Sequence, residues 1–113
     1  MILFGISNCD SVKKAKSFLI NNNITYDFHD FKAHGITATQ LDAWLTKVTW
    51  SELLNKRSTT YRQLTDAQKQ NLPNHAKDLM LAHPTLIKRP VLQTSDQLLI
   101  GFRLLDYQEL LHA

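Results

Sequence analysis

Near its start the chain contains the sequence Phe4-Gly5-Ile6-Ser7-Asn8-Cys9-Asp10-Ser11-Val12-Lys13-Lys14-Ala15, which joins an apolar run to a helix-starting cluster. The apolar residues 2–6 predict a short buried strand. Asp10 or Ser11 is suited to cap a helix that follows it. The only cysteine of the chain, Cys9, lies between the two elements. This junction is therefore the candidate reactive centre.

Cys9 has two possible roles. Unpaired backbone N–H groups at a helix N-terminus carry partial positive charge, which favours a thiolate over a thiol. Lys13 and Lys14 add cations one turn on, whereas Asp10 opposes them. The alternative is a small buried residue that packs the strand against the helix, which is the commoner role of a lone cysteine. This stretch by itself leaves both roles open.

Length and composition indicate one ordinary domain, because 113 residues are enough for a core and too few for two domains. A single cysteine cannot form an internal disulfide, and we see neither a secretory signal nor an apolar run of the roughly 18 residues that span a bilayer. We therefore expect a cytoplasmic monomer without a membrane partner. The net charge of +3 suits small anionic ligands but is too low for a dedicated nucleic-acid binder.

Hydrophobic periodicity predicts a strand, a helix and a strand at the start of the chain, helices in the middle, and two strands and a helix at the end. The predicted strands are residues 2–6, 24–28, 90–94 and 97–102. The first predicted helix begins at Asp10, and the others cover residues 37–48, 50–54, 64–72, 74–82 (capped by Asn74) and 104–111. A right-handed crossover makes the first two strands parallel, and a two-residue connection makes the last two an antiparallel hairpin. The pattern predicts one α/β domain, residues 1–113, with a mixed four-stranded sheet.

This order, with a cysteine at the first strand-to-helix turn and a proline opening the third strand, resembles the thioredoxin fold. Four separated motifs are similar to the ArsC/Spx-type family, most closely to its YffB-like branch. The motifs are residues 5–15 around Cys9, Leu53-Leu54-Asn55-Lys56-Arg57-Ser58-Thr59-Thr60-Tyr61-Arg62, Ile87-Lys88-Arg89-Pro90-Val91-Leu92 and Ile100-Gly101-Phe102-Arg103. The resemblance implies a glutaredoxin-like sheet with a helical insertion between the second and third strands, at about residues 37–84.

The resemblance also implies a chemistry. In the arsenate reductases of this family a cysteine attacks the oxyanion, three arginines hold it, and glutathione with glutaredoxin completes the reduction. Cys9 matches the cysteine, Arg57 and Arg89 match two arginines by their flanking residues, and Arg103 is a looser match to the third. A guanidinium offers its donors in a planar fork that suits an oxyanion. The alternative for each arginine is a surface ion pair, which we favour for Arg62 and, narrowly, for Arg103.

Supporting or glutathione-binding positions implied by the resemblance are Asn8, Lys13 and Pro90. The proline of thioredoxin-like folds is typically cis, and a cis bond here would expose backbone groups of Arg89 to an extended peptide such as glutathione. The five histidines lack the spacing of a zinc site, and one cysteine argues against a thiolate cage. We therefore expect no bound metal or cofactor, with glutathione as co-substrate.

The position three residues after Cys9 is Val12, so the chain has no Cys-x-x-Cys pair. A disulfide on Cys9 must then be opened by an external thiol, from glutathione or a glutaredoxin. We predict a glutathione-dependent thiol reductase that acts on an oxyanion or a glutathione mixed disulfide. The missing second cysteine argues against a thiol switch of the Spx type. It leaves open an Spx-like regulator that binds RNA polymerase without one.

Overall fold

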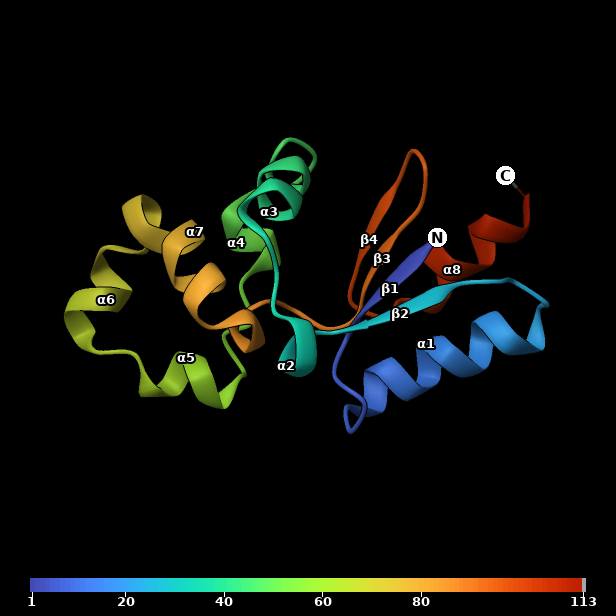
Figure 1. The fold of residues 1–113 in the computed structure, drawn as a ribbon, viewed down its shortest axis with the longest axis horizontal. Coiled ribbons are helices and arrows are strands. Elements are labelled where there is room, and N and C mark those ends of the chain that lie inside the picture. The colour runs from blue at the N-terminus through green and yellow to red at the C-terminus, as the bar shows by residue number, and fades with distance from the viewer. Residues whose placement is uncertain (113) are drawn as a thin grey trace. The chain divides into compact units, whose positions relative to one another are not determined.

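The computed structural model describes residues 1–112, and the chain divides into two compact units. Unit 1 consists of Met1–Asp30 and the segment from Arg89 onward, and unit 2 of Phe31–Lys88. Figure 1 shows the strands and two helices of unit 1 and the helices of unit 2. The single domain expected over residues 1–113 stays a prediction.

Unit 1 contains a mixed four-stranded sheet with the order β2-β1-β3-β4. The strands are β1 (Ile2–Gly5), β2 (Asp27–Asp30), β3 (Val91–Gln93) and β4 (Leu98–Ile100). β1 pairs with β2 in parallel and with β3 antiparallel, and β4 pairs with β3 antiparallel. This topology confirms the thioredoxin-like fold with a helical insertion between the second and third strands.

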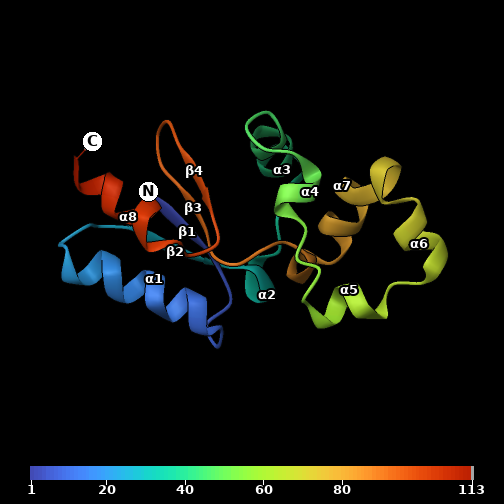
Figure 2. The ribbon, with the colours of Figure 1, turned by 180° about the vertical axis from the view of Figure 1, so that it is seen from behind.

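The core of unit 1 lies between the sheet and two helices, α1 (Asp10–Asn21) and α8 (Leu104–Glu109), the latter followed by a 3₁₀ turn (Leu110–His112). Leu3 and Leu92 pair across the sheet, so their side chains share one face. They form a buried cluster with residues of both helices, including Leu19 and Tyr107. α1 and α8, which Figure 2 shows from behind, therefore cover the same face of the sheet.

Tyr107 is the buried aromatic centre of this cluster, with 0% of its surface exposed. Its ring centroid lies 5.7 Å from that of Phe18 and 4.8 Å from that of Phe102. Its hydroxyl group is buried and has no hydrogen-bond partner within residues 1–112. Desolvation by burial, and secondarily the charge of Asp106, raise the pKa of Tyr107 well above its usual range.

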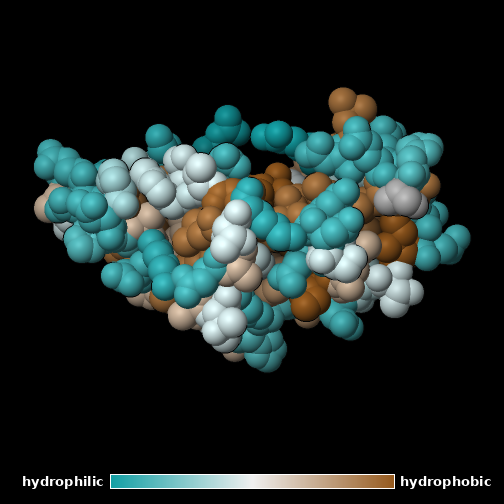
Figure 3. All heavy atoms as spheres, turned by 90° about the horizontal axis from the view of Figure 1, so that it is seen from above, coloured by the Kyte–Doolittle hydropathy of each residue, from teal (hydrophilic) through white to brown (hydrophobic). Residues whose placement is uncertain are grey.

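Exposed leucines also occur in unit 1. Leu104 and Leu105 of α8 are 51% and 75% exposed. Figure 3 shows one face of the molecule, on which hydrophobic residues are exposed among hydrophilic ones. A folded protein always leaves part of its apolar surface in water, so this exposure has no functional meaning by itself.

Unit 2 is helical. It consists of α2 (Phe31–His34), α3 (Ala38–Leu45), α4 (Trp50–Leu53), α5 (Thr59–Gln63), α6 (Asp66–Gln70), α7 (Leu72–Ala82) and a 3₁₀ turn (Pro84–Leu86). Trp44 is 2% exposed and Met80 is fully buried in its core. Within residues 1–112, no helix combines the length and apolar character needed to cross a membrane.

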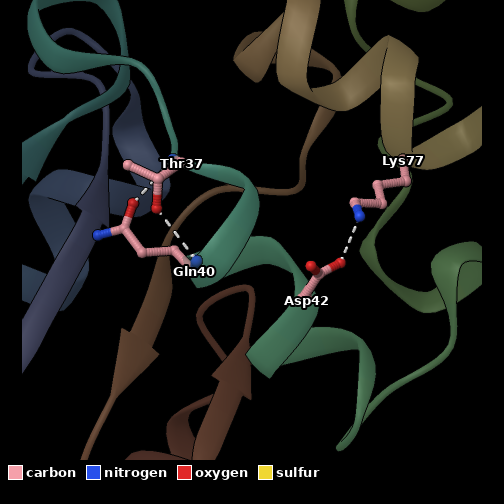
Figure 4. A network of polar contacts seen from close by, with 4 residues as sticks. All are labelled: Thr37, Gln40, Asp42 and Lys77. Carbon is pink, nitrogen blue, oxygen red and sulfur yellow. Dashed lines mark hydrogen bonds and ion pairs between the residues drawn. The ribbon is translucent and has the colours of Figure 1, made fainter.

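Hydroxyl side chains define where several helices of unit 2 begin. The Thr37 hydroxyl accepts a hydrogen bond from the Gln40 N–H (3.1 Å), and the Gln40 side chain accepts one from the Thr37 N–H (3.0 Å), which is a capping box (Figure 4). The same view shows Lys77 of α7 paired with Asp42 of α3 at 2.6 Å. Because both side chains are partly exposed to solvent, we expect this ion pair to contribute little stability.

The capping box leads to a stability prediction. Thr37→Ala should lower the free energy of unfolding by about 1 kcal/mol, because it leaves an N–H group at the start of α3 without its side-chain partner. Urea unfolding followed by circular dichroism measures this change. Thr39→Ala, at an exposed position of α3, is the matched control. Equal losses in the two variants would contradict the assignment of the cap.

Several predicted boundaries differ from the structure, and two of them have a clear physical cause. The strand predicted at residues 24–28 begins only at Asp27, because the Ile24 N–H still donates to the Leu19 carbonyl (2.9 Å) and closes the end of α1. The helix predicted to start after an Asn74 cap begins at Leu72 instead. Pro73 lies in its first turn, where a missing N–H costs no intrahelical hydrogen bond.

The short helices α2 and α5 were not predicted. Each has at most five residues, which is too short for a hydrophobic period to show in the sequence. The sequence did hold a signal for α5, because serine is a preferred helix cap. In the structure Ser58 caps α5 and accepts a hydrogen bond from the Tyr61 N–H at 3.0 Å.

Candidate functional site

Cys9 follows the carboxyl end of β1 and directly precedes α1. β2 runs parallel to β1, and its last residue, Asp30, pairs with Gly5. Ser7, in the loop before Cys9, donates a hydrogen bond to Asp30 Oδ2 at 3.2 Å. The loop that carries the thiol is therefore attached to the end of the neighbouring strand.

β3 and β4 bring two arginine-bearing segments to the same end of the sheet. β3 begins opposite the end of β1 and comes directly after Arg89 and Pro90. β4 ends opposite the beginning of β3 and is followed by residues that lead to Arg103. Antiparallel pairing thus places the backbone of both arginine segments at the end of the sheet that leads to Cys9.

Cys9 is the N-cap of α1, which differs from the predicted cap at Asp10 or Ser11. Its backbone is extended (φ −89°, ψ 127°), whereas Asp10 is already the first helical residue. Its carbonyl accepts a hydrogen bond from the Lys13 N–H (3.0 Å), and its own N–H donates to the Ile6 carbonyl (3.3 Å). The Cys9 side chain makes no capping hydrogen bond with the helix. The thiol therefore belongs to a residue at a helix N-terminus whose first N–H groups receive no acceptor from the N-cap side chain.

The Cys9 side chain is half-buried. It packs against the core cluster of unit 1 without being sealed inside it. The predicted placement of Cys9 at the start of the first helix is confirmed. Its burial is compatible with access by a small anion or a thiol.

The other predicted residues of unit 1 differ in exposure. Arg89 is half-buried, and Arg103 is exposed and is the N-cap of α8. Asn8 and Lys13 are exposed on either side of Cys9 in the sequence. The backbone of all four is near the same end of the sheet or the start of α1. Their contacts with a substrate remain predictions.

Pro90 is buried, and the Arg89–Pro90 peptide bond is cis, as the resemblance implied. The Pro90 carbonyl accepts a hydrogen bond from the Gly101 N–H at 2.8 Å. Gly101 has a φ of 74°, a conformation that glycine adopts at no steric cost. The segment before Arg103 is therefore attached to the start of β3.

Arg57 belongs to unit 2, in the loop between α4 and α5, and its side chain is exposed. Its N–H donates to Asn55 Oδ1 at 3.1 Å. The Asn55 N–H in turn donates to the Leu86 carbonyl at 2.8 Å. The loop that carries Arg57 is thus held within unit 2, and its role toward Cys9 stays a prediction.

Asp30 was not among the predicted site residues. The strand was expected to end at residue 28, so Asp30 was not recognised as the residue beside the end of β1. The sequence held one signal for Asp30: it comes at the carboxyl end of the strand that runs parallel to β1, and the carboxyl ends of parallel strands meet at one edge of a sheet.

A cavity of about 490 Å³ lies within unit 2. Its lining includes Leu45, Val48, Trp50, Pro73 and Lys77. None of the predicted site residues lines it. It is therefore separate from the candidate site of unit 1.

Comparisons with known proteins agree with this architecture. A family model described as the ArsC family matches residues 4–110. The solved structure of a protein named YFFB is 43% identical, with a TM-score of 0.90 and 96% of both chains covered. An arsenate reductase (ArsC) related protein from Brucella melitensis is 40% identical, with a TM-score of 0.76, 99% of this chain covered and 94% of that one.

A more distant relative is a regulator. The global transcriptional regulator Spx 2 of Bacillus anthracis is 28% identical over 104 residues, which is 90% of this chain and 79% of the regulator. Similar sequences therefore occur in a protein named as arsenate reductase related and in a protein named as a transcriptional regulator.

Proposed function

This chain belongs to the ArsC family, and from that premise we propose that it is a thiol-dependent reductase with Cys9 as its nucleophile. The observation that carries the proposal is the position of Cys9 at the N-terminus of α1, beyond the sheet end to which β3 and β4 also bring Arg89 and Arg103. A helix N-terminus and guanidinium groups both favour a thiolate and attract an oxyanion.

The proposed first substrate is arsenate. The Cys9 sulfur attacks arsenic, an S–As bond forms, and one oxygen leaves as water. The sulfur of glutathione then attacks the Cys9 sulfur, the electron pair of the S–As bond stays on arsenic, and arsenite departs. Cys9 is left in a disulfide with glutathione. A second thiol, from glutathione or glutaredoxin, opens that disulfide and restores Cys9.

The proposed roles of the other residues follow from their donors. Arg89 and Arg103 bind the oxygens of the anion through their planar forks, and anion binding by Arg57 of unit 2 stays a prediction from the sequence. Asn8, Lys13 and Pro90 support the loop or bind glutathione. A glutathione mixed disulfide is the second proposed substrate, because Cys9 would attack its glutathione sulfur to give the same Cys9–glutathione disulfide. We place the protein in the cytoplasm, where glutathione is reduced.

The test is an assay of the reduced protein with arsenate and glutathione, with and without glutaredoxin. We expect arsenite to form only when arsenate and glutathione are both present, and intact mass to show one glutathione on Cys9 during turnover. A glutathionylated peptide is the parallel substrate. If neither substrate turns over, the reductase proposal is wrong.

Arg89 offers a sharper prediction. Arg89→Lys keeps the charge but loses the fork, so kcat/KM for arsenate should fall about 10- to 100-fold, as expected for lost hydrogen bonds to a charged group. Arg62→Lys, at an exposed position of α5, is the matched control and should change kcat/KM less than twofold on the scale of ordinary surface substitutions. Equal losses of kcat/KM in both variants would contradict the proposed role of Arg89 in binding the anion.

The second candidate function is a transcriptional regulator, which a relative of that name favours, and RNA polymerase is its proposed partner. Binding of purified RNA polymerase to wild type and to Cys9→Ser distinguishes the two functions. A regulator without a thiol switch binds equally in both forms. If RNA polymerase is not bound while arsenate is reduced, only the reductase remains.

A further inference from the structure

β1 and α1 approach each other closely at Gly5. A Cβ atom built on Gly5 would lie 2.6 Å from Val12 Cγ2 and 3.4 Å from Val12 Cγ1. Carbon atoms in good contact are about 3.5–4.0 Å apart, so 2.6 Å is a clash. The φ angle of Gly5 is outside the positive region, in contrast to Gly35 and Gly101. The space beside Val12, and not the backbone conformation, therefore requires glycine here.

Val12 has little freedom to move away from such a clash. It is 0% exposed and belongs to the core cluster that also contains Leu3 and Ala15. As a β-branched residue in a helix it has one strongly preferred rotamer. Because the interior is densely packed, a side chain on Gly5 would displace the first turn of α1 as a whole.

That first turn begins at Cys9. The Cys9 carbonyl accepts the N–H of Lys13, which follows Val12 directly. On its other side, Cys9 is attached to the sheet through the bond from its N–H to Ile6 and through the contact of Ser7 with Asp30. A displaced first turn would therefore change where the Cys9 sulfur lies relative to the sheet end.

We infer that Gly5 is a positioning residue for the Cys9 thiol: its missing side chain lets the first turn of α1 rest on the end of β1. This inference rests on the proposed function, in which Cys9 is the nucleophile. Gly5 acts through Val12 and touches no substrate. The contact sets the position of the sulfur against the helix N–H groups and against the segments that carry Arg89 and Arg103.

The test compares wild type with Gly5→Ala, Val12→Ala and the double variant Gly5→Ala/Val12→Ala. The readout is the rate of Cys9 alkylation by iodoacetamide at pH 7, with circular dichroism to show that each variant is folded. Gly5→Ala should react about fivefold more slowly than wild type, the size of effect expected when a helix N-terminus interaction is lost. The double variant should react within twofold of Val12→Ala, because Val12→Ala removes the atoms that clash.

Leu19→Ala is the control for mere destabilisation, since Leu19 is fully buried in the same helix but away from the contact. It should leave the alkylation rate of the folded protein unchanged. If Gly5→Ala does not fold, Val12→Ile carries the test, because it enlarges the same contact from the helix side and should also slow alkylation.

Three outcomes would overturn the inference: a folded Gly5→Ala that reacts like wild type, a double variant that stays slow, or a Leu19→Ala that is equally slow. Failure of the proposed function has a different signature. In that case wild-type Cys9 itself reacts no faster than free glutathione at pH 7.

Discussion

Cys9→Ser should abolish arsenite formation, with a loss of at least about 1,000-fold in kcat, while the protein stays folded. A serine hydroxyl remains protonated at neutral pH and cannot form the disulfide through which glutathione enters the reaction. The substitution is nearly isosteric, and Cys9 is only half-buried, so the core of unit 1 should be preserved.

The measurement is arsenite production at saturating glutathione, with intact mass to detect the glutathione adduct. Ser17→Ala, at an exposed position of α1, is the control and should retain full turnover and the adduct. Because Cys9 is the only cysteine, an adduct or turnover that persists in Cys9→Ser would show that the thiol of this chain is not the nucleophile.

The largest stability effects are expected at Tyr107. Tyr107→Ala should lower the free energy of unfolding by about 3–5 kcal/mol, because it leaves a cavity among Phe18, Phe102 and the core of unit 1. Tyr107→Phe should have the opposite sign and raise it by about 1 kcal/mol. It keeps the ring and removes a hydroxyl that is buried without a partner in residues 1–112.

Tyr107 should also make stability depend on alkaline pH. Burial raises the pKa of Tyr107 in the folded state above the value of about 10 in the unfolded chain. Above pH 10 the unfolded state loses this proton while the folded state keeps it, so the unfolded state is favoured. The contribution of the protonated Tyr107 to the free energy of unfolding is therefore fully present below pH 10 and declines as the pH rises beyond it.

Urea unfolding at pH 8 and pH 11 measures both the stability changes of the Tyr107 variants and the loss of stability at alkaline pH. Tyr107→Phe should lose less stability than wild type between the two pH values. Tyr61→Phe is the matched control, because Tyr61 is half-buried in unit 2 and the Lys69 amine lies 5.0 Å from its ring centroid. If wild type and Tyr107→Phe lose the same stability, the hydroxyl is not desolvated as described.

Local signals in the sequence predicted much of the fold. Apolar runs bounded by turn residues predicted the four strands, and the helix predicted at residues 37–48 starts with Thr37, whose hydroxyl accepts an N–H group of the first turn. The same kind of signal predicted a helix beginning at Asp10, with Cys9 at the strand-to-helix junction. These features depend on residues close together in the chain.

The amino-acid sequence by itself determined the order of the four strands and of the α-helices other than α2 and α5, the place of Cys9 at the junction and membership of the ArsC family through separated motifs. Tertiary structure decided that Asp30 lies beside the end of β1, that Arg89 before β3 and Arg103 after β4 lie near that same end, and that Gly5 contacts Val12. The physical reason is register and packing. A pairing offset or a contact between side chains depends on how distant segments fit together in space, which no local pattern encodes.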